Sequence, residues 1–124
     1  MSQRAHEQLV RAILVAVSAT NRAAVWRQET GVGVPLHGTR PTRYGRVGSA
    51  DITGILDGGR RIEIEVKTGR ARQTPEQRDY QAMIEARGGL YVLARTVEDA
   101  VVAVVSASWT YRHTSALRPG ADGG

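Results

Sequence analysis

The sequence predicts an α/β domain in which helices pack on a β-sheet, and three observations support this fold class. Residues 3–19 repeat apolar side chains at helical spacing, whereas residues 49–56 and 60–67 each have one apolar and one polar side, as strands do. Residues 75–87 carry helix start and stop signals between two predicted strands. The chain has 124 residues and 41% hydrophobic content, which suits one compact domain.

The two main helices are predicted from their caps and their apolar faces. In residues 3–19, Ser2 is a candidate N-cap. One face of this helix carries the apolar side chains Leu9, Val10, Ile13, Leu14 and Val17. In the second helix, Thr74 is the expected cap, Pro75 takes the first helical position and Gly88 ends the helix.

Further strands are expected on either side of this region. The β-branched residues 25–36 predict a strand that breaks at Gly31 and Gly33, and residues 37–48 predict a loop with three arginines. Residues 90–94 predict a short buried strand.

The C-terminal part of the chain is expected to end in a loose tail. Residues 97–106 predict a short helix and a last strand, although the run VVAVV suits either structure. The segment after Arg112 is rich in glycine and polar residues. We therefore expect one domain over residues 1–111 and a flexible tail over 112–124.

Composition narrows the classes of function. The formal net charge is +5 and the pI is about 10.4, which favours binding to polyanions such as nucleic acid. The chain has no cysteine, so disulfides and thiolate metal sites are excluded, and the three scattered histidines predict no zinc site. No signal peptide or membrane-spanning run is recognisable, so we expect a soluble cytoplasmic protein.

The two central strands predict a cluster of charged groups. Side chains alternate faces along a strand, so Glu63, Glu65 and Lys67 share one face. A three-residue loop at 57–59 would set Asp51 opposite Glu65, with the two carboxylates about 5 Å apart. The same register pairs Thr53 with Glu63 and Ile52 with Ile64.

Two opposed carboxylates repel each other unless a cation lies between them, and oxygen ligands suit Mg²⁺ or Mn²⁺. Lys67 is the only lysine among 17 basic residues. A compact ammonium is a point charge that a planar guanidinium does not replace, which favours a functional role. The alternative is an exposed salt-bridged face in which Lys67 simply neutralises acids.

The strings GSADITGIL, IEVKTG, TPEQ and GGLYVLA resemble, in order and spacing, the VRR-NUC branch of the PD-(D/E)XK nuclease superfamily. The resemblance covers about residues 5–100. Asp51, Glu65 and Lys67 stand where that motif stands, although its Pro-Asp is here Ala-Asp. The resemblance implies a restriction endonuclease-like core, with a mixed central sheet flanked by helices. It also implies a divalent metal held by Asp51, Glu65 and the carbonyl of Val66.

Two further residues match the family, and each of them also suits a purely structural role. Glu7 corresponds to an acid on the family's first helix and would contribute a second metal or an outer contact, pointing toward Asp51. The alternative is a glutamate that the helix dipole favours in the first turn. Gln77 matches a family glutamine, but with Thr74 it also satisfies a capping box. His6 lies in the apolar stripe, where a core histidine is commoner than a ligand.

These residues predict a Mg²⁺-dependent DNA endonuclease that hydrolyses phosphodiester bonds. Asp51 and Glu65 would hold the metal, and Lys67 would contact the scissile phosphate or orient the attacking water. Five arginines would bind DNA phosphates without base-specific contacts: Arg40, Arg43, Arg46, Arg70 and Arg72. The alternatives are a non-catalytic nucleic-acid-binding module, a subunit with a purely structural cation site, and a general or restriction-like nuclease.

The resemblance also implies a homodimer that cuts four-way junctions, since small members of the branch act in that way. Two strands cut symmetrically call for two copies related by a two-fold axis. The sequence adds a surplus of apolar strand residues that would form the interface: Val25, Trp26, Val32, Val34 and Leu36. The alternative is that these residues complete the core of the monomer.

Overall fold

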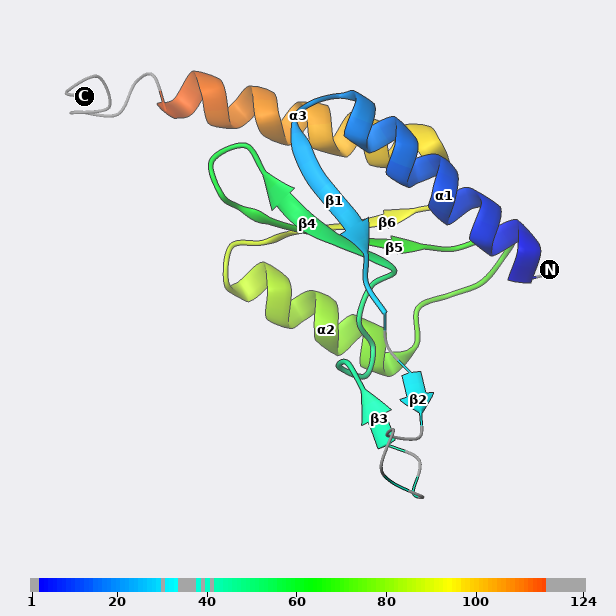
Figure 1. Ribbon diagram of the computed structural model, residues 1–124. Helices are drawn as coiled ribbons and strands as arrows, with labels where there is room; N and C mark the ends of the chain where they lie inside the picture. The colour runs from blue at the N-terminus through cyan, green and yellow to red at the C-terminus, as the bar shows by residue number, and fades with distance from the viewer. Residues whose placement is uncertain (1–2, 30, 34–37, 39, 41, 116–124) are drawn as a thin grey trace.

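The computed structural model describes residues 3–29, 31–33, 38, 40 and 42–115 of the chain. Three layers are formed. Helices α1 and α3 lie side by side on one side of a central sheet, and α2 lies on the other side (Figure 1). The predicted α/β class is confirmed.

The helices are α1, Gln3–Ala19, α2, Pro75–Ala86, and α3, Val97–Ser115. The expected capping box of α2 is present. The Thr74 hydroxyl accepts the N–H of Gln77, and the Gln77 side chain accepts the N–H of Thr74. Because each residue satisfies a donor of the other, the start of α2 is fixed in place.

The central sheet has the strand order β1-β4-β5-β6 and is mixed. Its strands are β1, Ala23–Arg27, β4, Ile52–Leu56, β5, Arg61–Val66, and β6, Leu90–Ala94. The first three run antiparallel in this order, and β5 pairs in parallel with β6. Helix α2 makes the crossover that a parallel pair requires.

The predicted hairpin register is confirmed. Thr53 pairs with Glu63 and Ile52 pairs with Ile64, so residues 57–59 form the connecting loop. Asp51 lies just before the first residue of β4. Its carboxylate is thereby placed at the end of β5 where Lys67 lies.

Two predictions for residues 25–48 are wrong. The expected strand 25–36 is divided, because β1 ends at Arg27 and β2, Gly31–Gly33, pairs with β3, Thr42–Tyr44, in a separate two-stranded sheet. The expected loop 37–48 therefore contains a strand. Val34 and Leu36 fall outside the described residues.

The expected last strand within 97–106 does not form, because α3 runs unbroken to Ser115. A reciprocal cap starts this helix. The Thr96 hydroxyl accepts the N–H of Asp99, and the Asp99 carboxylate accepts the N–H groups of Arg95 and Thr96. Helix α3 thus extends past residue 111, where the domain was expected to end, and residues 116–124 lie outside the described part.

The main core lies between the sheet and the α1/α3 layer. Its fully buried side chains include Val10, Ile13, Val17, Ile52, Ile62, Ile64, Ala100 and Val104. A smaller cluster under α2 comprises Ala50, Tyr80, Ile84 and Tyr91. None of the described helices is both long and apolar enough to cross a membrane.

Candidate active site

A row of charged side chains lies on the face of β5 that α2 covers. Arg61, Glu63, Glu65 and Lys67 follow one another at every second residue, as the alternation of a strand requires. Both glutamates are buried, with 0% exposure at Glu63 and 1% at Glu65. Buried carboxylates are costly unless they are hydrogen-bonded or paired, so their partners decide what this row can do.

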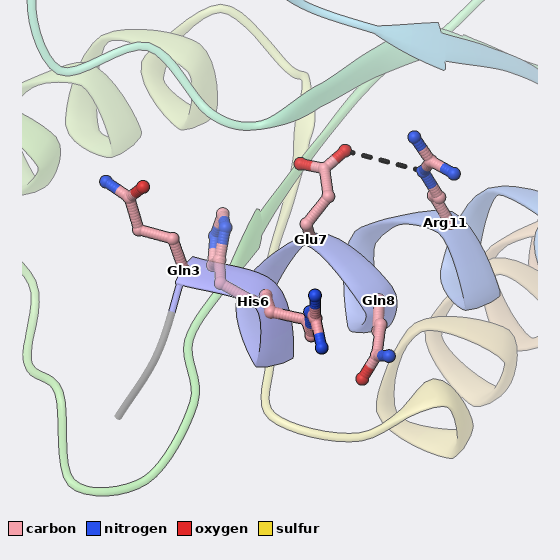
Figure 2. Close-up of a pocket in the computed structure, with 6 residues that line it drawn as sticks. Gln3, His6, Glu7, Gln8 and Arg11 are labelled. Atoms are coloured by element: carbon pink, nitrogen blue, oxygen red, sulfur yellow. Dashed lines mark ion pairs between the residues drawn. The ribbon is translucent and has the colours of Figure 1, made fainter.

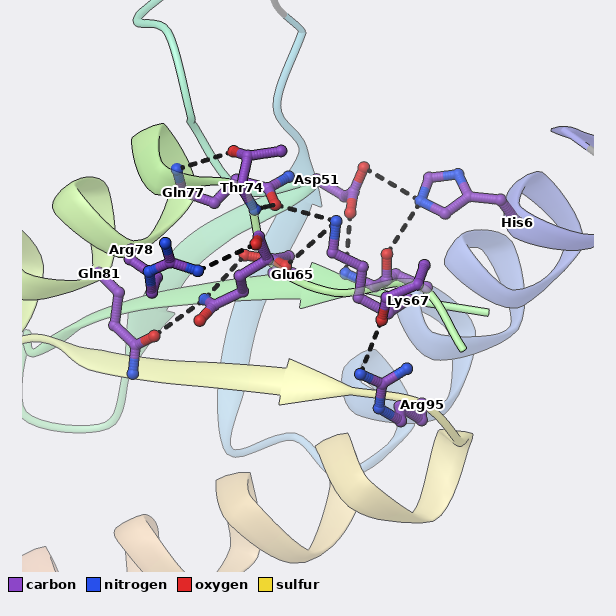
Figure 3. A network of polar contacts seen from close by, with 12 residues as sticks. His6, Asp51, Glu65, Lys67, Thr74, Gln77, Arg78, Gln81 and Arg95 are labelled. Carbon is purple, nitrogen blue, oxygen red and sulfur yellow. Dashed lines mark hydrogen bonds and ion pairs between the residues drawn. The ribbon is translucent and has the colours of Figure 1, made fainter. Parts of the chain in front are cut away.

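Asp51 is fixed against the end of β5. Its Oδ2 accepts the N–H of Val66 at 2.8 Å, and its Oδ1 lies 3.4 Å from Nε2 of His6 (Figure 3). The same ring nitrogen lies 3.1 Å from the carbonyl oxygen of Val66. The three groups therefore converge at one point beside Lys67.

Glu65 has one satisfied and one unsatisfied oxygen. Its Oε1 accepts the hydroxyl of Tyr91 and the Nε2 of Gln73, the latter at 3.2 Å. Its Oε2 is buried and has no hydrogen-bond partner among the described residues, although Nζ of Lys67 is 3.5 Å away. Burial and the contact with Glu65 raise the pKa of the Tyr91 hydroxyl above its ordinary value, so Tyr91 remains a donor.

The side chain and the main chain of Lys67 each form a hydrogen bond. Its Nζ donates to Oε1 of Gln77 at 2.9 Å, and its side chain is 13% exposed. Its main-chain N–H donates to the carbonyl of Ala94 at 3.0 Å, which extends the β5–β6 pairing by one residue. Gln77 thus caps α2 and contacts Lys67 through the same oxygen. The capping role and a position beside the candidate site therefore do not exclude each other.

Glu7 pairs with arginines, and no contact joins it to Asp51 among the described residues. Its carboxylate forms two hydrogen bonds with Arg27 of β1 and lies 3.5 Å from Nε of Arg11 (Figure 2). Arg27 lowers the pKa of this carboxyl below its ordinary value. The helix brings His6 to Asp51 instead, because neighbouring positions on a helix point about 100° apart. The role of Glu7 in metal binding stays a prediction without a supporting contact.

Three residues of this cluster were missed from the sequence: His6, Gln73 and Tyr91. His6 was assigned to the core because it falls in the apolar stripe of α1. Tyr91 follows from the parallel pairing of β5 with β6, which places Glu63 beside Tyr91 and Glu65 beside Leu93. The alternation of side chains along residues 90–94 indicates which face of the strand Tyr91 lies on. It does not indicate that this strand pairs with β5, which is what brings Tyr91 to Glu65. Gln73 lies in a loop without a pattern.

The residues present fit a divalent cation. A buried carboxylate oxygen without a donor favours a positive neighbour, and Asp51 and the Val66 carbonyl offer two further oxygens at the same end of β5. Within the described residues, no three His, Asp or Glu side chains form a metal cluster of their own. Two side chains and one carbonyl would therefore be the ligand set.

The predicted DNA-contacting arginines lie at the surface where they are described. Arg40, Arg46, Arg70 and Arg72 are exposed. Arg43 lies in β3, and its side chain falls outside the described residues.

Comparison of the sequence with models of known protein families and with curated proteins found no match.

Proposed function

We propose that this protein is a metal-dependent endonuclease that hydrolyses phosphodiester bonds in DNA. The observation that carries the proposal is the buried Oε2 of Glu65, which lacks a hydrogen-bond donor among the described residues and lies 3.5 Å from Nζ of Lys67. The next residue along β5, Val66, donates the N–H that anchors Asp51. A carboxylate left in this state favours a cation. The order Asp51, Glu65, Lys67 also matches the PD-(D/E)XK motif.

Asp51, Glu65 and the Val66 carbonyl would hold Mg²⁺ or Mn²⁺. When bound, the ion supplies positive charge at the phosphate and makes a bound water more acidic. Lys67 supplies a second, compact positive charge, because Gln77 holds its ammonium beside Glu65. Preorganised charge of this kind stabilises the negative charge that develops on the phosphate.

The mixed sheet flanked by helices is compatible with a restriction endonuclease-like core, which we propose for this chain. Exposed arginines would supply affinity without sequence readout. The substrate we propose is branched DNA, with a four-way junction as the preferred form. Two copies of the chain would then cut the two strands.

A second candidate function rests on the number of partners that Glu65 already has. Tyr91, Gln73 and Lys67 surround its carboxylate, which is enough to stabilise it as a structural group. In that case the protein binds nucleic acid and cuts nothing.

The test is a cleavage assay on supercoiled plasmid, four-way junction and linear duplex with Mg²⁺, with Mn²⁺ and with EDTA. We expect nicking with either metal and none with EDTA. Isothermal titration with Mn²⁺ in the absence of DNA adds an independent measurement. Binding to wild type that is lost in Glu65→Gln supports the ligand set, whereas DNA binding without any cleavage supports the second candidate.

A further inference from the structure

The face of the sheet that carries the candidate active site is only partly covered. Helix α2 packs mainly on β6 at one edge of the sheet. At the other edge, the pairing of Trp26 with Thr53 and of Ala24 with Ile55 places Trp26 and Ile55 on the same face as Glu63. Trp26 is 51% exposed and Ile55 is 50% exposed. Exposed apolar side chains that adjoin one another on an uncovered sheet face are typical of a binding surface.

Two adjoining hollows lie on this open face, with volumes of about 410 and 470 Å³. Both are lined by Gln28 and Arg61, so we treat them as one groove. Trp26 and Ile55 line one end of it, and Arg46 and Arg87 line the other.

One wall of the groove is fixed by close packing. Gly48 has a φ of +82°, and a Cβ at this position would lie 2.3 Å from the carbonyl oxygen of Glu76. The turn 46–49 therefore lies directly against the first turn of α2, and only glycine permits this approach. Arg46 at the start of that turn lines the groove, and its main-chain carbonyl accepts hydrogen bonds from Ser49. Its guanidinium forms no hydrogen bond or ion pair with the other described residues.

The groove carries a surplus of positive charge. Its lining holds one acid, Glu29, and four arginines: Arg27, Arg46, Arg61 and Arg87. Glu63 lies beneath the groove and is fully buried. Its carboxylate accepts hydrogen bonds from Gln28, Tyr80, Thr53 and Arg61. Glu63 therefore neutralises Arg61 in part, and Glu7 pairs with Arg27. Arg46 and Arg87 remain to bind an anion, although Arg87 donates one N–H to the carbonyl of Met83.

We propose that this groove binds an unpaired segment of a DNA strand, with a base stacked on Trp26 and phosphates bound by Arg46 and Arg87. An exposed indole offers a stacking surface that any base can use, and guanidinium groups bind phosphate oxygens. A duplex keeps its bases stacked on one another, so only an unpaired base gains from Trp26. The groove lies about 20 Å along β5 from Lys67, at about 3.3 Å per residue from position 61 to 67.

The choice of DNA as the strand rests on the proposed function, whereas the stacking and phosphate contacts follow from the groove alone. The test is fluorescence anisotropy in EDTA with a labelled oligonucleotide of about twelve thymidines, a length within the range of one single-strand site. A duplex of equal length is the second probe. Circular dichroism checks that each variant is folded.

Trp26→Ala should weaken single-strand binding about tenfold or more and leave duplex binding nearly unchanged. Trp26→Phe should restore most of the affinity, because a phenyl ring still stacks. The pair Arg46→Gln and Arg87→Gln should lower the slope of log affinity against log salt by about one to two. Arg112→Gln, which removes one charge on α3 across the sheet, is the control and should change the slope little.

Three results would overturn the inference: equal single-strand affinity of Trp26→Ala and wild type, a loss that is equal for duplex, or a change of molecular mass in Trp26→Ala. The last would assign the face to a second copy of the chain. The outcome is separate from the proposed function. Single-strand binding that depends on Trp26, without any cleavage, would support the proposed groove and refute the nuclease function. Cleavage by a protein whose single-strand binding does not depend on Trp26 would support the nuclease function and refute the groove.

Discussion

The ammonium of Lys67 is held in position by its neighbours. It is nearly buried, paired with Glu65 and hydrogen-bonded to Gln77. A lysine chosen only to neutralise an acid would not need the second contact. The geometry therefore agrees better with a positioned charge than with an exposed salt bridge.

Lys67→Ala should lower nicking of DNA about a hundredfold or more, because a positioned charge at a reacting phosphate commonly has that effect. DNA affinity should be nearly unchanged, since it is spread over many arginines. Plasmid nicking and anisotropy measure the two quantities. Lys67→Arg is the control for charge, and we expect it to stay impaired because the planar guanidinium is larger. Undiminished nicking by purified Lys67→Ala would refute the assignment.

Tyr91 gives a prediction on the pH dependence of stability. Its folded pKa is raised, mainly by burial, so the unfolded chain loses the Tyr91 proton first as the pH rises. The stabilisation is complete below the unfolded pKa of about 10 and is lost above it. Urea unfolding from pH 8 to 11 should show a smaller decline in Tyr91→Phe than in wild type. Tyr111→Phe on α3 is the matched control, and an equal decline in all three proteins would contradict the prediction.

At the scale of elements, the first turn of α2 serves both folding and the candidate site. Thr74 and Gln77 exchange hydrogen bonds at the cap, but only Gln77 also contacts Lys67. A pair of variants at this turn therefore separates the two roles.

Thr74→Ala and Gln77→Ala should each lower the free energy of unfolding by about 0.5–2 kcal/mol, the usual cost of losing a cap. Only Gln77→Ala should also slow cleavage, because it releases the ammonium of Lys67. Denaturant unfolding and nicking assays on the same preparations measure both. If the two variants lose activity equally, the contact with Lys67 has no functional role.

The sequence predicted those elements whose signals are local. The ranges of α1 and α2 follow from spacing and caps, and the β4–β5 register follows from the short loop and the two-sided pattern of its strands. The run VVAVV was ambiguous because valine suits both a strand and a buried helix face. The cap formed by Thr96 and Asp99 favours the helix, and Ala100 and Val104 are buried one helical turn apart.

The candidate site was predictable in part for the same reason. Asp51, Glu65 and Lys67 come from one hairpin, so local pairing brings them together. His6 and Tyr91 come from segments distant along the chain, and their places depend on the packing of α1 and on the parallel pairing of β6. Only the folded chain shows these contacts.

At the scale of the whole molecule, the exposed apolar residues differ in part from those expected at a dimer contact. Val25 packs against the main core, which leaves Trp26 as the half-exposed member among the described side chains of the predicted set. On α3, by contrast, Val102, Val105 and Trp109 are exposed at 54%, 46% and 60%. Their spacing places them on one stripe, opposite the buried face of the helix.

We predict a homodimer in which these α3 stripes pack together. Light scattering at micromolar concentration should give twice the monomer mass, and Val105→Glu should give the monomer, because two like charges would meet near the two-fold axis. Val15→Glu, an equal change at an exposed valine of α1, is the control. A monomer mass for wild type, with and without junction DNA, would refute the prediction.

The row of charges on β5 has a consequence for the electric field that an approaching polyanion meets. Arg61, Glu63, Glu65 and Lys67 carry formal charges in the order plus, minus, minus, plus. Such a row has no net charge and almost no dipole along the strand, so its field falls away over a short distance. The two buried acids therefore do not repel DNA from afar. The long-range attraction comes from the charges outside the row, which retain the whole net charge of +5.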